Sequence, residues 1–101
     1  MIVIAGTARV LPKHRETAIE AARIMVEASR AEPGCRRYRF STDLDDPNLV
    51  HVFEEWDSAE ALEVHFATPH MAEFQTALGA TLDGAPEITR FEVTVAGPLF
   101  G

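Results

Sequence analysis

The sequence has one cysteine, few basic residues and no long hydrophobic run, and each shortage excludes a class of protein. Cys35 cannot form an internal disulfide and has no second thiol for a zinc site, so we expect a structural role for it. The 16 acidic and 9 basic side chains give a net charge of −7, which would repel nucleic-acid phosphates. No segment has the length of a membrane span, and no basic region precedes the apolar start. We therefore expect a cytoplasmic protein without nucleic-acid or membrane partners.

Short motifs of common catalytic sites are also missing. No glycine-rich turn of the kind that binds phosphate or flavin is present, and no set of side chains has the sequence spacing of a metal site. We expect no cofactor and no metal. At 101 residues the chain is predicted to be one domain, 1–101, with little room to enclose a substrate unless a second subunit helps.

Hydrophobic periodicity predicts strands and helices in a definite order. The predicted strands are 1–10, 35–42, 49–56 and 87–96, and the predicted helices are 13–31, 57–66 and one starting at 69. This order is typical of the split βαβ arrangement, an α+β, ferredoxin-like fold whose four-stranded antiparallel sheet carries helices on one face. The many alanines of helix 13–31 predict that it lies close on the sheet.

Gly6 stands in the middle of the first predicted strand, where it removes a side chain. Such a glycine permits close approach of another backbone or of a ligand. The other face of the sheet would be bare, although the first and last strands are apolar on both sides. Two sheets facing each other in a homodimer would cover it, and the tail Pro98-Leu99-Phe100, too hydrophobic for a free end, is expected to dock on another surface.

The stretch from Phe53 to Phe66 combines a strand end with a capped helix. Glu54 and Trp56 fall on one face of the strand, since side chains alternate. Asp57 or Ser58 is expected to cap the following helix. On that helix His65 lies on a short apolar stripe, so it is predicted to point inward.

Six segments spread along the chain occur together in one known family. They are Ile4-Ala5-Gly6-Thr7, Glu32-Pro33-Gly34-Cys35, Asp45-Asp46-Pro47-Asn48, Glu54-Glu55-Trp56, Ala61-Leu62-Glu63-Val64-His65 and Thr68-Pro69-His70. Together they resemble the antibiotic biosynthesis monooxygenase domain family, in particular its small quinol-monooxygenase-like members. The resemblance covers essentially the whole chain. It implies a dimeric α+β barrel with a pocket in each subunit between sheet and helices.

The resemblance also implies a cofactor-independent monooxygenase that oxidises a small electron-rich aromatic, such as a quinol, phenol or anthrone-like compound, with O2. The substrate supplies the electrons, so the protein must provide a base, apolar walls and a dry space. His65 is the preferred base, and Glu54 would orient the imidazole or the substrate hydroxyl. The expected substrate-binding residues are Trp56, Phe66, Phe74, Tyr38, His70 and His51.

Alternatives to this activity remain open. His65 followed by Thr68-Pro69-His70 also occurs in isomerases of this family that process a phosphorylated signalling sugar, and a non-enzymatic small-ligand-binding dimer is a further alternative. A lone histidine on an apolar helical stripe is commonly a packed core residue, and only the family resemblance makes the role of base about as favoured for His65. The haem-degrading branch fits poorly, because His65 and Gln75 stand where it has a tryptophan and the iron ligand.

Overall fold

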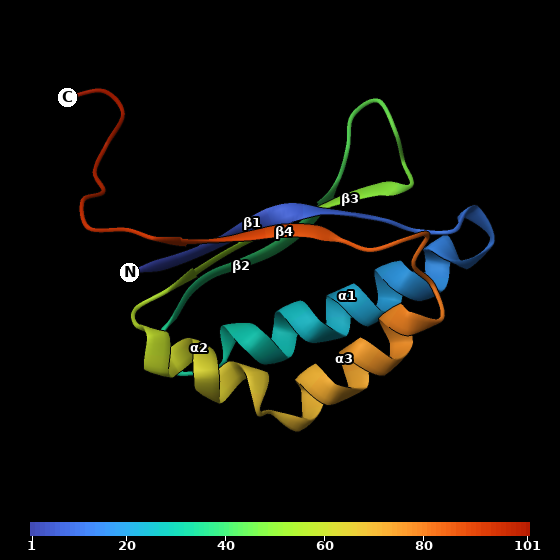
Figure 1. The fold of residues 1–101 in the computed structure, drawn as a ribbon, viewed down its shortest axis with the longest axis horizontal. Helices are drawn as coiled ribbons and strands as arrows, with labels where there is room; N and C mark the ends of the chain where they lie inside the picture. The colour runs from blue at the N-terminus through green and yellow to red at the C-terminus, as the bar shows by residue number, and fades with distance from the viewer.

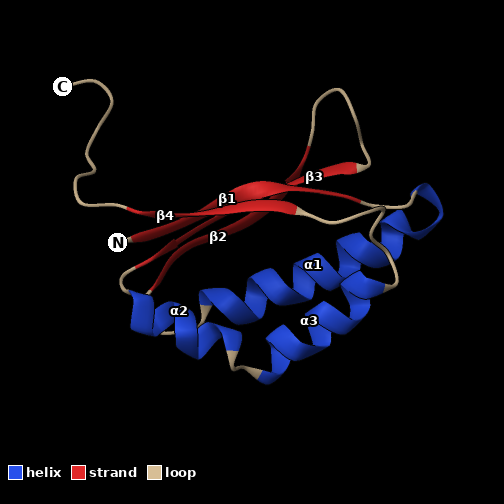
Figure 2. Ribbon diagram, in the orientation of Figure 1, coloured by secondary structure: helices blue, strands red, loops and turns tan.

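The computed structural model describes residues 1–101 as two layers, a four-stranded sheet and a layer of helices (Figures 1 and 2). In chain order the elements are β1 (Ile2–Arg9), the 3₁₀ turn η1 (Pro12–His14), α1 (Arg15–Arg30), β2 (Cys35–Thr42), β3 (Leu49–Trp56), α2 (Ala59–Phe66), α3 (Pro69–Gly79) and β4 (Glu87–Glu92). The strand order is β2-β3-β1-β4, and all neighbours are antiparallel. The predicted α+β, ferredoxin-like fold is confirmed. None of the helices has the length and apolar character needed to cross a membrane.

Strand alternation builds the core between the two layers. On β1 and β3 the even-numbered side chains face the helices, since residues two apart lie on the same face of a strand. The buried cluster joins strand and helix residues: Ile2, Ile4, Met25, Tyr38, Trp56, Leu62 and Phe74. Trp56 and Leu62 are fully buried, so the strand end and the start of α2 are held together at this point.

Most predicted bounds agree with the structure to within two residues, but β4 differs by more, and the structure decides between the two predicted caps of α2. β4 ends at Glu92 rather than at 96, because its only partner is β1 and Ile2, the first residue of β1, pairs with Glu92. The cap of α2 is Ser58, whose hydroxyl accepts a hydrogen bond from the Ala61 amide at 3.1 Å. Asp57 instead pairs with Arg36. The predicted cap of α3 is confirmed, with the Thr68 hydroxyl accepting from the Met71 amide.

Gly6 lies where the backbone of β4 comes closest to β1. A Cβ atom on Gly6 would overlap the carbonyl oxygen of Glu87 and lie 2.5 Å from the Cα of Ile88. The expected close approach is therefore that of another backbone.

Gly6→Ala is expected to lower the free energy of unfolding by about 1–3 kcal/mol, because the added methyl must displace the β4 backbone. Chemical denaturation measures the change. Gly79→Ala is the matched control, since a Cβ there meets nothing within 4 Å and alanine favours a helix. A Gly6→Ala protein as stable as the wild type would contradict the close approach.

The sheet face opposite the helices carries large exposed hydrophobic side chains. Phe53 of β3 and Phe91 of β4 are 38% and 49% exposed, and no helix lies over this face (Figure 1). The chain beyond β4 extends away from the body, and its Leu99 and Phe100 side chains are each 87% exposed. Uncovered apolar surface of this kind is typical of an interface.

We expect this sheet face to pair with the same face of a second copy, so sedimentation at micromolar concentration should show a dimer. Phe53→Asp is expected to shift the protein toward a folded monomer, because a charge would be buried in the interface. Val64→Asp is the control, since Val64 is 61% exposed on α2 in the helical layer. A wild-type monomer at that concentration would rule out the dimeric barrel.

Candidate functional site

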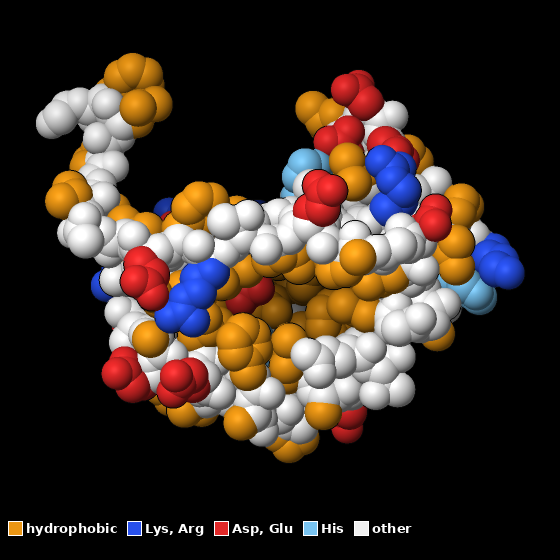
Figure 3. Space-filling model, in the orientation of Figure 1, with side chains coloured by type: hydrophobic (Ala, Val, Ile, Leu, Met, Phe, Trp, Pro, Cys, Tyr) orange, Lys and Arg blue, Asp and Glu red, His pale blue; other side chains and the backbone are white.

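A cavity of about 1230 Å³ lies between the inner face of the sheet and helices α1 and α3 (Figure 3). Of its 30 lining residues, 18 are hydrophobic. Ala18 and Ala22 of α1 are among them, although Ala18 is 5% exposed and Ala22 packs against the core, as expected for an alanine-rich helix close to the sheet. Short alanine side chains leave the space open there, whereas Met25 on the same helix fills the core.

Glu54 is an acidic side chain in the wall of this cavity. It points inward from β3 and is only 7% exposed. Burial raises the pKa of its carboxyl from 4.5 to about 7, and the charge of Glu32 adds to this rise. The Trp56 indole opposes it, because its Nε1–H donates a hydrogen bond to Glu54 Oε1 at 2.9 Å. Glu54 Oε2 has no hydrogen-bond partner in the protein, so it can accept a proton from a ligand.

Tyr38 lies beside Glu54, since the two residues pair across β2 and β3. It also lines the cavity. Burial, and then the charge of Glu54, raise the pKa of the Tyr38 hydroxyl far above its ordinary value of 10. The phenol therefore stays protonated at neutral pH and can donate a hydrogen bond to a ligand.

His65 is fully buried on α2, as its place on the apolar stripe predicts. Its Nδ1 lies 2.7 Å from Glu32 Oε2, and its ring packs against Trp56 with centroids 4.6 Å apart. An ionised carboxylate only accepts, so Nδ1 carries the proton and Nε2 is left as an acceptor. Nε2 lies 3.5 Å from the Tyr38 hydroxyl. His65 itself is not among the lining residues, so its nearest link to the cavity is Tyr38.

The other predicted site residues divide into two groups. Phe66 and Phe74 line the cavity together with Tyr38. Trp56, His70 and His51 do not. Trp56 lies in the core, and His51 pairs with Asp43 through Nε2 and Oδ1 at 2.8 Å.

Glu32 is a site residue that the sequence did not reveal, because the Glu32-Pro33-Gly34 segment indicates only the end of a helix. Its Oε2 lies 2.7 Å from His65 Nδ1 and 2.8 Å from His70 Nε2. Its Oε1 is buried without any hydrogen-bond partner. These contacts join residues 33 and 38 positions apart, and no local spacing signals such a cluster.

Comparison with known proteins places the chain among related sequences. The antibiotic biosynthesis monooxygenase family matches residues 1–77. A Bacillus subtilis protein with the name "Putative monooxygenase YcnE" is 32% identical over 95 residues, which are 93% of this chain and 99% of that protein. The uncharacterised protein sll1783 of Synechocystis is 41% identical over 73 residues, 72% of this chain, but the match spans only 50% of that protein.

A solved structure agrees with these sequence matches. The crystal structure of a protein from Deinococcus radiodurans, described as a putative antibiotic biosynthesis monooxygenase, superposes with a TM-score of 0.89. The two are 27% identical, and the superposition covers 100% of each chain. The fold and the sequence match over residues 1–77 agree, and the chain belongs to the antibiotic biosynthesis monooxygenase family.

Proposed function

We propose that this protein is a monooxygenase that oxidises a small electron-rich aromatic compound with O2, and that Glu54 is the base that starts the reaction. The observation that carries the proposal is a buried carboxyl with a pKa of about 7 in the wall of a mainly hydrophobic cavity. A group with this pKa is half ionised near neutral pH and can take a proton from an acidic phenol or anthrone. Family membership and the name of the Bacillus relative support the same class of reaction.

The size and lining of the cavity favour an aromatic substrate. Small-molecule sites typically enclose about 300–1,000 Å³, so a cavity of about 1230 Å³ can hold fused rings. Phe66 and Phe74 supply aromatic wall, and the protonated Tyr38 supplies a hydrogen-bond donor for a substrate oxygen. Since 18 of the 30 lining residues are hydrophobic, the lining favours an aromatic ring over a sugar ring.

For an anthrone-like substrate the proposed reaction balances without an added reductant. Glu54 removes a proton from the ring methylene, and the resulting carbanion gives its electrons to O2 to form a carbon–oxygen bond. The second oxygen atom then leaves as water with both former methylene hydrogens, and the carbon becomes a carbonyl. The mainly hydrophobic lining offers few polar groups that could return a proton to the carbanion.

His65 remains a second candidate for the base, as the sequence predicts. Its imidazole Nε2 lies 3.5 Å from the hydroxyl of Tyr38, which lines the cavity, so that phenol could relay a proton to His65. We favour Glu54 because its carboxyl lies in the cavity wall itself. His65 and Tyr38 would then hold the wall of the cavity in place.

Oxygen consumption tests the proposed function. Purified protein, treated with chelator and given no flavin, is expected to consume O2 with members of a panel of quinols, phenols and anthrones. When the reaction is run under ¹⁸O2, mass spectrometry should show one ¹⁸O atom in the product of an anthrone. Heat-denatured protein corrects for spontaneous oxidation. Absence of O2 uptake over the whole panel, together with conversion of a phosphorylated sugar, would replace this proposal by an isomerase.

A further inference from the structure

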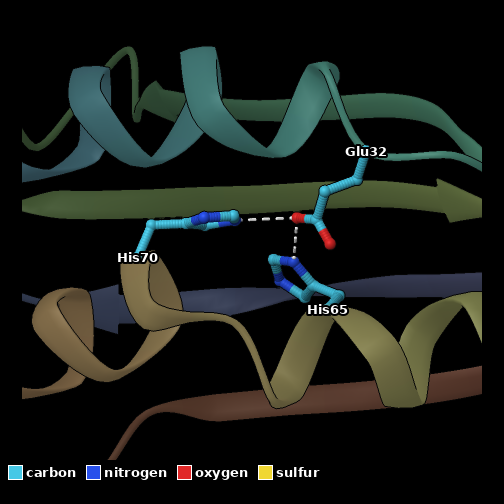
Figure 4. Close-up of side chains that lie close together, drawn as sticks. All are labelled: Glu32, His65 and His70. Atoms are coloured by element: carbon cyan, nitrogen blue, oxygen red, sulfur yellow. Dashed lines mark hydrogen bonds and ion pairs between the residues drawn. The ribbon is translucent and has the colours of Figure 1, made fainter.

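Three side chains from distant parts of the chain converge outside the cavity (Figure 4). Glu32 follows the end of α1, His65 belongs to the last turn of α2, and His70 belongs to the first turn of α3. Glu32 Oε2, His65 Nδ1 and His70 Nε2 all lie within 4.8 Å of one another. Two imidazoles and one carboxylate therefore aim their donor atoms at one point.

Hydrogen bonds within the cluster leave part of it unsatisfied. Both imidazoles contact the same oxygen, Glu32 Oε2, at 2.7 and 2.8 Å. The second oxygen, Oε1, is buried and has no hydrogen-bond partner, and the Glu32 side chain is only 9% exposed. An ionised carboxylate with one bare, buried oxygen loses its hydration without compensation. A cation bound by the carboxylate would compensate for the lost hydration.

We propose that Glu32, His65 and His70 bind a divalent transition-metal ion, with Zn²⁺ as the reference probe. Histidine nitrogen and carboxylate oxygen are ligands that Zn²⁺ and its neighbours in the first transition series accept. Ligand bonds of about 2.0–2.2 Å require the nitrogen and oxygen atoms to move apart by only about half an ångström from their present contacts. Three protein ligands leave one position for water.

The surroundings of the cluster suit a bound ion. When His65 Nδ1 binds an ion, the ring proton moves to Nε2, which lies 3.5 Å from the Tyr38 hydroxyl; that oxygen can then accept a hydrogen bond from Nε2 and orient the ring. The His70 side chain is 23% exposed, so an ion can enter from that side. None of the three ligands lines the cavity, so a bound ion would not touch a substrate there. We assign the ion a role in joining the end of α1 to α2 and α3.

Metal titration of chelator-stripped protein tests the proposal. Zn²⁺ is expected to bind at one ion per chain in isothermal titration calorimetry and to raise the thermal midpoint. Co²⁺ should develop the visible absorption of a nitrogen- and oxygen-ligated ion. His70→Ala, at the partly exposed ligand, and Glu32→Gln are each expected to weaken Zn²⁺ binding by about 10²-fold or more. Circular dichroism confirms that the variants remain folded.

His51→Ala is the matched control, because His51 and Asp43 form a similar contact at 2.8 Å without a third ligand. This variant is expected to bind Zn²⁺ as the wild type does. Wild-type protein that binds neither ion, or a folded His70→Ala variant that binds Zn²⁺ unchanged, would overturn the proposal. The cluster would then be a hydrogen-bonded group that only supports the fold.

Discussion

Glu54→Gln is expected to lower turnover of an accepted aromatic substrate by about 10²–10⁴-fold while the protein stays folded. The amide cannot take up a proton at neutral pH, but its oxygen can still accept the hydrogen bond that Trp56 Nε1 donates at 2.9 Å. Shape and local packing are therefore retained, and the base alone is lost. Initial rates of O2 uptake measure the change.

The pH profile of the wild type provides a second readout of the same group. Only the ionised carboxylate can accept a proton, so the rate is expected to rise with pH through about 7 and to level off above it. Glu55→Gln is the control, because Glu55 lies on the other face of β3 and pairs with Arg37. It should keep both the rate and the profile. A folded Glu54→Gln variant with wild-type turnover would remove Glu54 from the mechanism and leave His65, tested by His65→Gln, as the remaining candidate.

Replacement of Glu54 by glutamine is also expected to stabilise the protein at alkaline pH, by up to roughly 3 kcal/mol at pH 8. The pKa of the carboxyl is about 7 in the folded protein and 4.5 in its ordinary state, so the folded protein holds this proton more tightly. The tighter binding of this proton stabilises the folded protein fully below pH 4.5. The stabilisation falls as the pH rises and is absent above about 7. The neutral amide does not suffer this loss.

Denaturant unfolding of both proteins at several pH values measures this linkage. Near pH 4 the wild type and Glu54→Gln should be about equally stable, and the difference should open between pH 4.5 and 7. Other titrating groups are common to both proteins and cancel. Glu55→Gln should not become more stable than the wild type as the pH rises. A Glu54→Gln protein no more stable than the wild type at pH 8 would show that burial does not raise the pKa of Glu54.

The sequence alone predicted those features that depend on local periodicity. β2 and β3 have the predicted bounds, Cys35–Thr42 and Leu49–Trp56, because alternation and the intervening turn residues are local signals. The shared face of Glu54 and Trp56 and the inward position of His65 follow from the same periods. The order of the elements then restricts the topology to very few arrangements, and the ferredoxin-like sheet is one of them.

Features that depend on more than one element needed the tertiary structure. The end of β4 is determined by where β1 starts, and Ser58 rather than Asp57 caps α2, whereas Asp57 pairs with Arg36 of β2. The alanines of α1 predicted close packing, and Ala22 does pack against the core, but the sequence did not predict that Ala18 and Ala22 also line the cavity, because periodicity indicates only which face of a helix is inward.

The candidate site shows the same division between local and tertiary information. The sequence predicted Glu54 and His65 as reactive groups. The pKa of Glu54, however, is raised by burial among residues from other elements, and no local sequence pattern predicts that burial. The meeting of Glu32 with His65 and His70 across 33 and 38 positions likewise arises only when α1, α2 and α3 pack together. Sequence determined which groups face inward, because side-chain direction follows the backbone period. Tertiary structure decided which of them meet and which reach the cavity, because distance and burial depend on all the layers at once.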